Sequence, residues 1–323
     1  MVTDGSPSVR SWFLTLQAKS QQKGGSMGQE RVALITGCGS GIARHLTTVL
    51  SGRGYRILAT DINPESLEHS ARELKWNADR VKLHTLDVRD AEAWKEAVAV
   101  VVRTWGKLDV CMNIAGFAIQ GFVHQFPLEH IDLHIDINTK GAILGTRFAA
   151  EQMIKQGSGH IVNMCSLAGL APVPGTSLYS ASKFALRGFS LAVSYELKPR
   201  GIDVSLIEPD LVDTAKLQTQ LIYGDEAAAV GFSAPRILSV EDVVAVILKR
   251  VLEEKVLEAA IPPWRGWLCK FGGTFPRLTG QIHKIVTKMG MKNLSREKAK
   301  RQGYAQVVTP DKWLYEREVK KKK

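Results

Sequence analysis

The chain has 323 residues, 45% of them hydrophobic, which suits one α/β domain of about 250 residues followed by an extension. Its net charge of +11 is uneven, because residues 264–323 hold 16 Lys and Arg against 4 Asp and Glu, whereas residues 1–263 hold 27 against 28. The neutral body argues against a nucleic-acid-binding surface and assigns any anionic partner to the C-terminal part.

The cysteines and the hydropathy exclude further classes of protein. Cys38, Cys111, Cys165 and Cys269 form no CxxC pair and no His/Cys cluster at metal-ligand spacing, which favours a reduced, intracellular protein without a metal site. The sequence has no stretch of about 18 apolar residues, so a transmembrane helix is not predicted. A cytoplasmic location is expected.

Three regions follow one another along the chain. Residues 1–26 are rich in Ser and Gln and are interpreted as a flexible leader. Residues 27–262 carry alternating strand and helix patterns and form the expected domain, and residues 263–323 form a basic amphipathic C-terminal helical extension.

The middle region reads as alternating strands and helices. Helical segments such as 41–54 and 63–75 separate the apolar runs and end at glycines or begin at Asn-Pro. This alternation predicts an α/β fold with a doubly wound parallel sheet and helices on both faces. The predicted strands are 31–37, 55–61, 80–88, 107–116, 158–166 and 202–209.

A glycine-rich loop, TGCGSGIA, joins the first predicted strand to the first helix at residues 36–43. Gly37, Gly39 and Gly41 permit a tight turn and a close approach of backbone N–H groups to a pyrophosphate. The helix N-terminus behind the loop favours that negative charge. With a strand before it and a helix after it, the loop predicts a Rossmann-like dinucleotide site.

Asp61 ends the second predicted strand, 20 residues after Gly41. A carboxylate at this position can accept hydrogen bonds from a ribose 2′-hydroxyl, and it would repel a 2′-phosphate. No Lys or Arg stands at positions 38, 40, 62 or 63 to attract such a phosphate. NAD is therefore the expected cofactor, and NADP is less favoured.

The segment YSASK places Tyr179 and Lys183 four residues apart, on one face of a helix. Together with the glycine loop, LDV at 86–88 and NIAG at 113–116, it makes residues 31 to about 262 resemble the short-chain dehydrogenase/reductase family. The resemblance implies an NAD(P)-dependent oxidoreductase of CH–OH donors. It also implies a catalytic tetrad of Asn138, Ser166, Tyr179 and Lys183.

The family's cofactor contacts map onto this chain residue by residue, with Asp87 as the expected adenine contact. The resemblance implies cofactor binding by Gly37, Gly39, Ser40, Gly41, Ile42, Asp61, Asp87, Val88, Asn113, Ala115, Gly116, Tyr179, Lys183, Pro209 and Thr214.

The expected chemistry explains the Tyr–Lys pair. A hydride joins or leaves a carbinol carbon only if the oxygen exchanges a proton, and tyrosine, with a reference pKa of ~10, is a poor base near neutrality. The Lys183 ammonium and an oxidised nicotinamide favour the Tyr179 phenolate. By resemblance, Lys183 also holds the ribose hydroxyls, Ser166 donates to the substrate oxygen, and Asn138 positions a water for proton relay.

Three positions depart from the family pattern. Ala43 replaces the third loop glycine, and Ile114 replaces a second asparagine. Asp210, in EPDLVDT, stands where the family has a glycine close to the nicotinamide. The sequence leaves open whether Asp210 is a displaced loop residue or an electrostatic partner of the oxidised ring.

Apolar residues in two loops near the expected nicotinamide site favour an apolar alcohol or ketone, such as a steroid, a retinoid or a long-chain lipid. Ordinary loop packing explains them equally well. Residues 211–237 form the expected lid. Alternative functions are a 3-oxoacyl-thioester reductase and a nucleotide-binding regulatory protein without turnover. The loop residues are Phe117, Ile119, Phe122, Phe126, Leu167, Leu170 and Pro172.

The extension contains a predicted amphipathic helix over 275–289, preceded by Trp264 and Trp267. It suits peripheral contact with a membrane that holds anionic lipid, or packing against the lid or a sister subunit. The final lysines, 320–323, resemble an endoplasmic-reticulum retrieval ending. Family resemblance further implies a homodimer or homotetramer. The apolar stripe is Phe275, Leu278, Ile282, Ile285, Val286 and Met289, with Arg277, Lys284 and Lys288 outside it.

Overall fold

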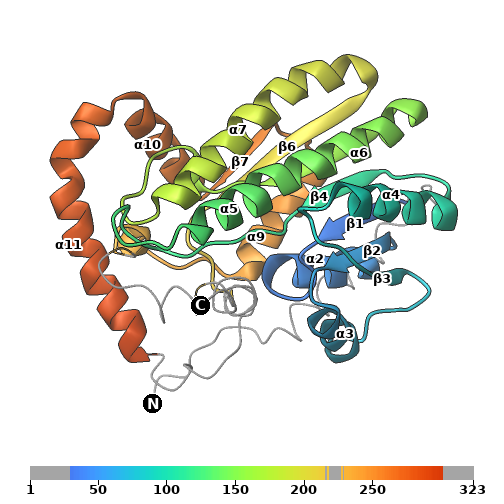
Figure 1. Ribbon diagram of the computed structural model, residues 1–323, viewed down its shortest axis with the longest axis horizontal. Coiled ribbons are helices and arrows are strands. Elements are labelled where there is room, and N and C mark those ends of the chain that lie inside the picture. The colour runs from blue at the N-terminus through green and yellow to red at the C-terminus, as the bar shows by residue number, and fades with distance from the viewer. Residues whose placement is uncertain (1–29, 215–216, 218–226, 228, 301–323) are drawn as a thin grey trace.

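The computed structural model describes residues 30–214, 217, 227 and 229–300, with the side chains of 278–283 excepted. The predicted leader, the lysine ending and part of the predicted lid lie outside the described residues. The described chain forms a sheet with helices on both faces, and two C-terminal helices stand at one end of it (Figure 1).

The sheet has seven parallel strands in the order β3-β2-β1-β4-β5-β6-β7, so the doubly wound prediction is confirmed. The chain order reverses between β1 and β4, and in open α/β sheets such a switch point is where ligands bind. The strands are β1 (Val32–Thr36), β2 (Arg56–Asp61), β3 (Val81–Thr85), β4 (Val110–Asn113), β5 (Gly159–Met164), β6 (Ile202–Pro209) and β7 (Glu258–Ile261).

Six of these strands are the predicted ones, whereas β7 is an addition. Its sequence, EAAI, is short and alanine-rich, and such a stretch has little strand preference of its own. Pairing with β6, from Leu206 with Glu258 to Pro209 with Ile261, makes it a strand. A tertiary contact thus decides its conformation.

Strand β1 shows why the sheet is covered on both sides. All five of its residues are buried, and they point alternately into two apolar cores. Ala33 and Ile35 belong to the core under α2 and α9, and Val32 and Leu34 belong to the core under α4 and α6. The continuous apolar run in the sequence follows from burial on both faces.

Two groups of helices supply these cores (Figure 1). One face carries α2 (Gly41–Gly52), α3 (Pro64–Glu73), α9 (Val240–Val246) and the π-helix η6 (Ile247–Glu253). The other carries α4 (Ala91–Trp105), α5 (Glu129–Ile135), the π-helix η1 (Asp136–Lys140), α6 (Gly141–Gln156) and α7 (Ser177–Leu197). The 3-10 helices are η2 (Leu167–Gly169), η3 (Lys198–Arg200) and η5 (Gly231–Ser233).

The predicted C-terminal extension forms two helices, α10 (Pro263–Thr274) and α11 (Pro276–Lys300). Trp264 and Trp267, which precede the predicted amphipathic helix, lie on α10. Helix α10 packs against β7 and η2, and α11 packs against η5. In Figure 1 both helices lie at the end of the molecule opposite β3.

Candidate active site

A cavity of about 630 Å³ opens at the carboxyl ends of the strands. Thirteen of the predicted site residues line it, and this size and position suit a dinucleotide together with a small substrate. The thirteen are Gly37, Ser40, Gly41, Ile42, Asp61, Asp87, Val88, Ala115, Gly116, Ser166, Tyr179, Pro209 and Thr214.

The glycine loop is shaped so that side chains are excluded from it. Gly37 and Gly41 have φ angles of 80° and 56°, which L side chains rarely adopt. A Cβ added at Gly39 would stand 2.9 Å from Asp61 Oδ2, because the Gly39 N–H donates to that oxygen at 2.9 Å. The loop therefore leaves a bare cradle at the start of α2, which fits a pyrophosphate.

Asp61 joins this cradle to the end of β2. Its Oδ1 accepts from the Asn63 N–H at 2.9 Å, and its Oδ2 accepts from Gly39. Burial raises the pKa of Asp61, and the hydrogen bonds from Asn63 and Gly39 oppose that rise. Each oxygen retains a second lone pair, so the carboxylate can also accept from ribose hydroxyls.

Asp87 follows β3 and is held by Arg89. The guanidinium makes a two-pronged contact, with Nε 2.9 Å from Oδ1 and Nη2 2.6 Å from Oδ2. Arg89 also lines the cavity, although the sequence analysis did not single it out. The LDVR segment thus presents a carboxylate–guanidinium pair at the expected adenine end.

Thr36 and Asn113 act behind the cavity wall. The Thr36 hydroxyl accepts from the N–H groups of Ile114 and Ala115 at 3.0 Å each, which fixes the end of β4 against β1. Asn113 was expected to contact the cofactor, but its side chain is buried outside the cavity lining and donates to Asn163 Oδ1 at 2.7 Å. This bond ties β4 to β5 behind the wall, and a contact between Asn113 and the cofactor stays a prediction.

The Tyr–Lys pair lies at the other end of the cavity, on α7. Lys183 is buried, and its Nζ donates to the Met164 carbonyl at 2.8 Å and stands 5.6 Å from the centre of the Tyr179 ring. Tyr179 lines the cavity, whereas Lys183 lies behind it. The ammonium is close enough to act electrostatically on the phenol.

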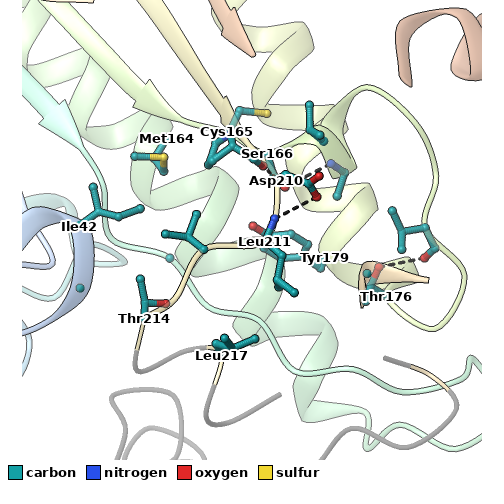
Figure 2. A pocket seen from close by; sticks show the side chains of 18 of the residues that line it. Ile42, Met164, Cys165, Ser166, Thr176, Tyr179, Asp210, Leu211, Thr214 and Leu217 are labelled. Atoms are coloured by element: carbon teal, nitrogen blue, oxygen red, sulfur yellow. Dashed lines mark hydrogen bonds between the residues drawn. The ribbon is translucent and has the colours of Figure 1, made fainter. Parts of the chain in front are cut away.

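Ser166 caps η2 directly after β5. Its Oγ accepts from the Ala168 N–H at 3.2 Å and faces the Pro209 carbonyl at 3.4 Å. In Figure 2, Ile42 of the glycine loop lies towards one side of the view, apart from Ser166 and Tyr179. A carbonyl oxygen between these two hydroxyls would be polarised by both.

Asn138 lies on the π-helix η1 and does not line the cavity. The Asn138 Oδ1 accepts a hydrogen bond from the Phe117 N–H at 2.7 Å. The Asn138 Nδ2 donates to the Phe117 carbonyl at 2.8 Å and to Ser182 Oγ at 3.0 Å. The side chain therefore braces the loop after β4 against α7. A single π-turn often occurs at functional sites.

Asp210 forms an ion pair with Arg265 of α10, with 2.5 Å between Oδ2 and Nε. Both side chains are largely buried, and both residues line the cavity. Burial raises the pKa of Asp210, and Arg265 opposes the rise. The residue that replaces the family's glycine thus attaches the C-terminal extension to the end of β6.

The substrate end of the cavity differs from the expectation. Phe117, Ile119, Phe122 and Phe126 do not line it, and Phe117 is fully buried against the ring of His134 at 4.9 Å. Helices α10 and α11 supply part of the wall instead. The apolar lining includes Leu167, Pro172 and Val173 after β5, Leu211 and Leu217 after β6, and Leu268, Cys269, Pro276 and Val286 from the extension.

The described residues also bear on the reactivity of the thiols, on metal binding and on membrane crossing. Burial raises the pKa of Cys38, Cys111 and Cys165 to about 12, so these thiols stay protonated near neutrality. Among the described residues, no group of three or more His, Cys, Asp and Glu is placed to hold a metal ion. Within the same part of the chain, no helix is long and apolar enough to cross a membrane.

Comparison with known proteins identifies relatives of this architecture. Residues 31–221 match the family described as short chain dehydrogenase. A 3-oxoacyl-[acyl-carrier-protein] reductase of Thermotoga maritima is 32% identical over 218 residues, which cover 68% of this chain and 89% of the relative.

Two solved structures share the fold at lower identity. A short chain dehydrogenase/reductase from Burkholderia phymatum in complex with NAD has a TM-score of 0.69 at 22% identity, covering 78% of this chain and 95% of its own. The protein ElxO with NADP bound has a TM-score of 0.65 at 23% identity, covering 72% and 97%. Proteins with this fold thus bind either dinucleotide.

Proposed function

The chain belongs to the short-chain dehydrogenase family and is an NAD(P)-dependent oxidoreductase of CH–OH donors, and we propose that NAD and an apolar secondary alcohol or ketone are its reactants. One observation carries the proposal: Tyr179 and Ser166 line the same cavity as the glycine loop and Asp61.

The glycine loop and Asp61 would hold a dinucleotide, which when bound would supply the hydride chemistry. Tyr179 exchanges the proton at the substrate oxygen, and Ser166 donates a hydrogen bond to that oxygen. Lys183, whose ammonium lies 5.6 Å from the phenol ring centre, favours the phenolate. Asn138 keeps the loop after β4 in place through Phe117 and so acts as a positioning residue in this proposal.

Asp61 supports the preference for NAD. It is half-buried, it accepts hydrogen bonds from Gly39 and Asn63, and its negative charge would repel a 2′-phosphate. The test is a fluorescence titration of the purified protein with NADH and, separately, NADPH. Micromolar binding of NADH with much weaker binding of NADPH is expected, and a preference for NADPH would overturn this part of the proposal.

The assignment of Tyr179 is tested by Tyr179→Phe, which removes the proton donor and keeps the ring. Turnover should fall by at least about a hundredfold while NADH still binds, since general acid–base catalysis contributes 10²–10⁴-fold. Tyr195→Phe is the matched control, because Tyr195 lies exposed on the same helix and should retain full activity. Undiminished turnover in Tyr179→Phe would show that another group moves the proton.

The apolar walls after β5 and β6 support an apolar substrate, and the relative from Thermotoga maritima makes a 3-oxoacyl thioester the alternative. Comparing kcat/KM for long-chain ketones with that for 3-oxoacyl thioesters distinguishes the two. A higher value for the thioesters would replace our substrate class, and turnover of neither would assign the substrate to another class of CH–OH compound.

We also propose that two copies associate through α5, α6 and α7. Exposed apolar side chains on these helices support a contact there: Ile131, Ile135, Ile154, Phe184 and Tyr195. Light scattering of the wild-type protein should give twice the chain mass of 35.5 kDa, or four times that mass for a tetramer. Ile131→Arg should then give a smaller species, and an unchanged mass would place the contact elsewhere.

A further inference from the structure

Helix α10 turns its small residues inward and its large apolar residues outward, which reverses the usual pattern of a surface helix. On the inner side, a Cβ added at Gly266 would lie 2.2 Å from the Ala260 Cβ, and one at Gly273 would lie 2.2 Å from the Leu170 carbonyl oxygen. The glycines allow the helix backbone to pack directly on β7 and on the loop around η2. The packing of α10 against β7 and η2 therefore leaves its aromatic side chains on the outer side of the helix.

The outer side of α10 is an apolar stripe at helical spacing. Trp264, Trp267, Leu268 and Phe271 recur every three or four residues, and their exposed fractions are 52%, 77%, 60% and 55%. The stripe continues onto Phe275, whose ring packs against that of Phe271 at a tilt of 48°, with 4.9 Å between the ring centres. Contiguous exposed apolar side chains of this kind mark an interaction surface.

Basic residues accompany the stripe on the next helix. Arg277, Lys284 and Lys288 of α11 are exposed, and Ile285 and Met289 are exposed beside them. Residues 264–323 hold 16 of the 43 Lys and Arg of the chain against only 4 acidic residues. Tryptophans, apolar side chains and lysines together are the composition that binds the interface of an anionic bilayer.

The same two helices form part of the cavity wall. Leu268 and Cys269 of α10 and Pro276 and Val286 of α11 line the cavity that also holds Tyr179. Leu268 belongs both to the exposed stripe and to this lining. The apolar surface outside and the apolar wall inside are therefore continuous.

We propose that the α10–α11 face, defined as Trp264, Trp267, Leu268, Phe271, Phe275 and the adjoining basic residues of α11, docks on an anionic membrane and admits an apolar substrate from the bilayer to the cavity. This inference rests on the proposed function for the nature of the substrate. A long-chain alcohol or ketone dissolves in the bilayer, and continuity between the docked face and the cavity spares it a passage through water. The Asp210–Arg265 pair holds α10 in place beside the entrance.

The first test is co-sedimentation of the full chain with vesicles of phosphatidylcholine alone or with a third of phosphatidylserine. The protein should bind the anionic vesicles and release them at high salt. A double variant, Trp267→Glu with Phe271→Glu, should lose more than about tenfold in binding, because it removes two exposed apolar side chains and adds like charge. Leu128→Glu is the matched control, since Leu128 is also 77% exposed but lies before α5.

The charge contribution is tested separately with Lys284→Gln and Lys288→Gln together. Each lysine near an anionic surface is worth about fivefold in binding, so the pair should cost about 25-fold with anionic vesicles and nothing with neutral ones. Quenching of tryptophan fluorescence by brominated lipid should occur in the wild type and fall when Trp264 and Trp267 are both replaced by Phe.

Activity measurements separate this inference from the proposed function. The Trp267→Glu, Phe271→Glu variant, whose two positions lie outside the cavity lining, should bind NADH normally and turn over a short, water-soluble ketone at the wild-type rate, yet lose turnover of a long-chain ketone held in vesicles. If the wild type turns over no ketone, the proposed function fails. If it turns over the soluble ketone but binds no vesicle, or if light scattering shows the face to be a contact between copies, the docking inference fails.

Discussion

Glu208 offers a quantitative test of how the end of β6 is held. Its side chain is fully buried, and among the described residues no hydrogen bond reaches either carboxylate oxygen. Arg187 Nε stands 3.5 Å from Glu208 but hydrogen-bonds to Glu258 at 2.7 Å, and Lys270 of α10 donates to the same Glu258 at 2.6 Å. Burial, and then repulsion by Glu258, raise the pKa of Glu208 to about 8.

The sign of the effect on stability follows from proton uptake. In the unfolded chain Glu208 loses its proton near its ordinary pKa of 4.5, whereas in the folded protein it keeps the proton up to about pH 8. Between these values the folded state binds more protons, so this residue makes stability fall as pH rises. One proton corresponds to about 1.4 kcal/mol of unfolding free energy per pH unit.

Glu208→Gln removes the titration and keeps the shape of the neutral acid. Relative to wild type, its unfolding free energy should rise by about 1.4 kcal/mol per pH unit between about pH 5 and 7.5, as measured by urea unfolding followed by circular dichroism. A difference that does not change with pH would refute the argument, because Glu208 would then be ionised in the folded protein across this range.

Glu258→Gln is the control of opposite sign. Although burial raises the pKa of Glu258, hydrogen bonds from Arg187 and Lys270 outweigh it and lower the pKa overall. Its ion pairs therefore contribute stability above about pH 4.5, and this contribution disappears as the pH falls through the lowered pKa. The Glu258→Gln variant should be destabilised at pH 7 and should approach wild type only in acid.

Three further substitutions test individual contacts. Asp210→Gly restores the family's residue but leaves Arg265 buried without its partner, so unfolding free energy should fall by ~3 kcal/mol, and adding Arg265→Leu should recover most of it in urea unfolding. Gly39→Ala places a Cβ 2.9 Å from Asp61 Oδ2 and should weaken NADH binding more than about tenfold, while far-UV circular dichroism stays unchanged. Asn113→Ala should cost ~2 kcal/mol of stability and leave the Kd for NADH within about twofold, since that side chain lies behind the cavity wall; a loss of NADH binding would instead support a contact between Asn113 and the cofactor.

Features of the fold that depend on residues close together in the chain were predictable from the sequence, and features that depend on contacts between distant residues were not. The strand β1, the glycine loop and Asp61 were predictable because a buried parallel strand reads as one apolar run, and because the loop's backbone geometry requires glycine. Tyr179 and Lys183 were recognisable from their helical spacing together with these motifs. By contrast, β7 has no strand pattern of its own and exists through its pairing with β6.

The candidate active site likewise combines residues that the sequence identified with partners that only the tertiary structure brings to them. Asp210 was visible as a departure, but its partner Arg265 lies on a helix that returns to the cavity only after β7 has formed. At the end of β4 the sequence leaves open whether a polar side chain faces the ligand or the sheet interior, and the bond from Asn113 to Asn163 places this one in the interior.

By itself, the sequence determined the parallel α/β architecture, the family and the cofactor cradle, because these depend on residues close together in the chain. Only the tertiary structure decided that α10 and α11, rather than the phenylalanines after β4, complete the substrate end of the cavity. The physical reason is packing: Gly266 and Gly273 let α10 lie directly on β7 and η2, and that fit depends on surfaces contributed by distant segments.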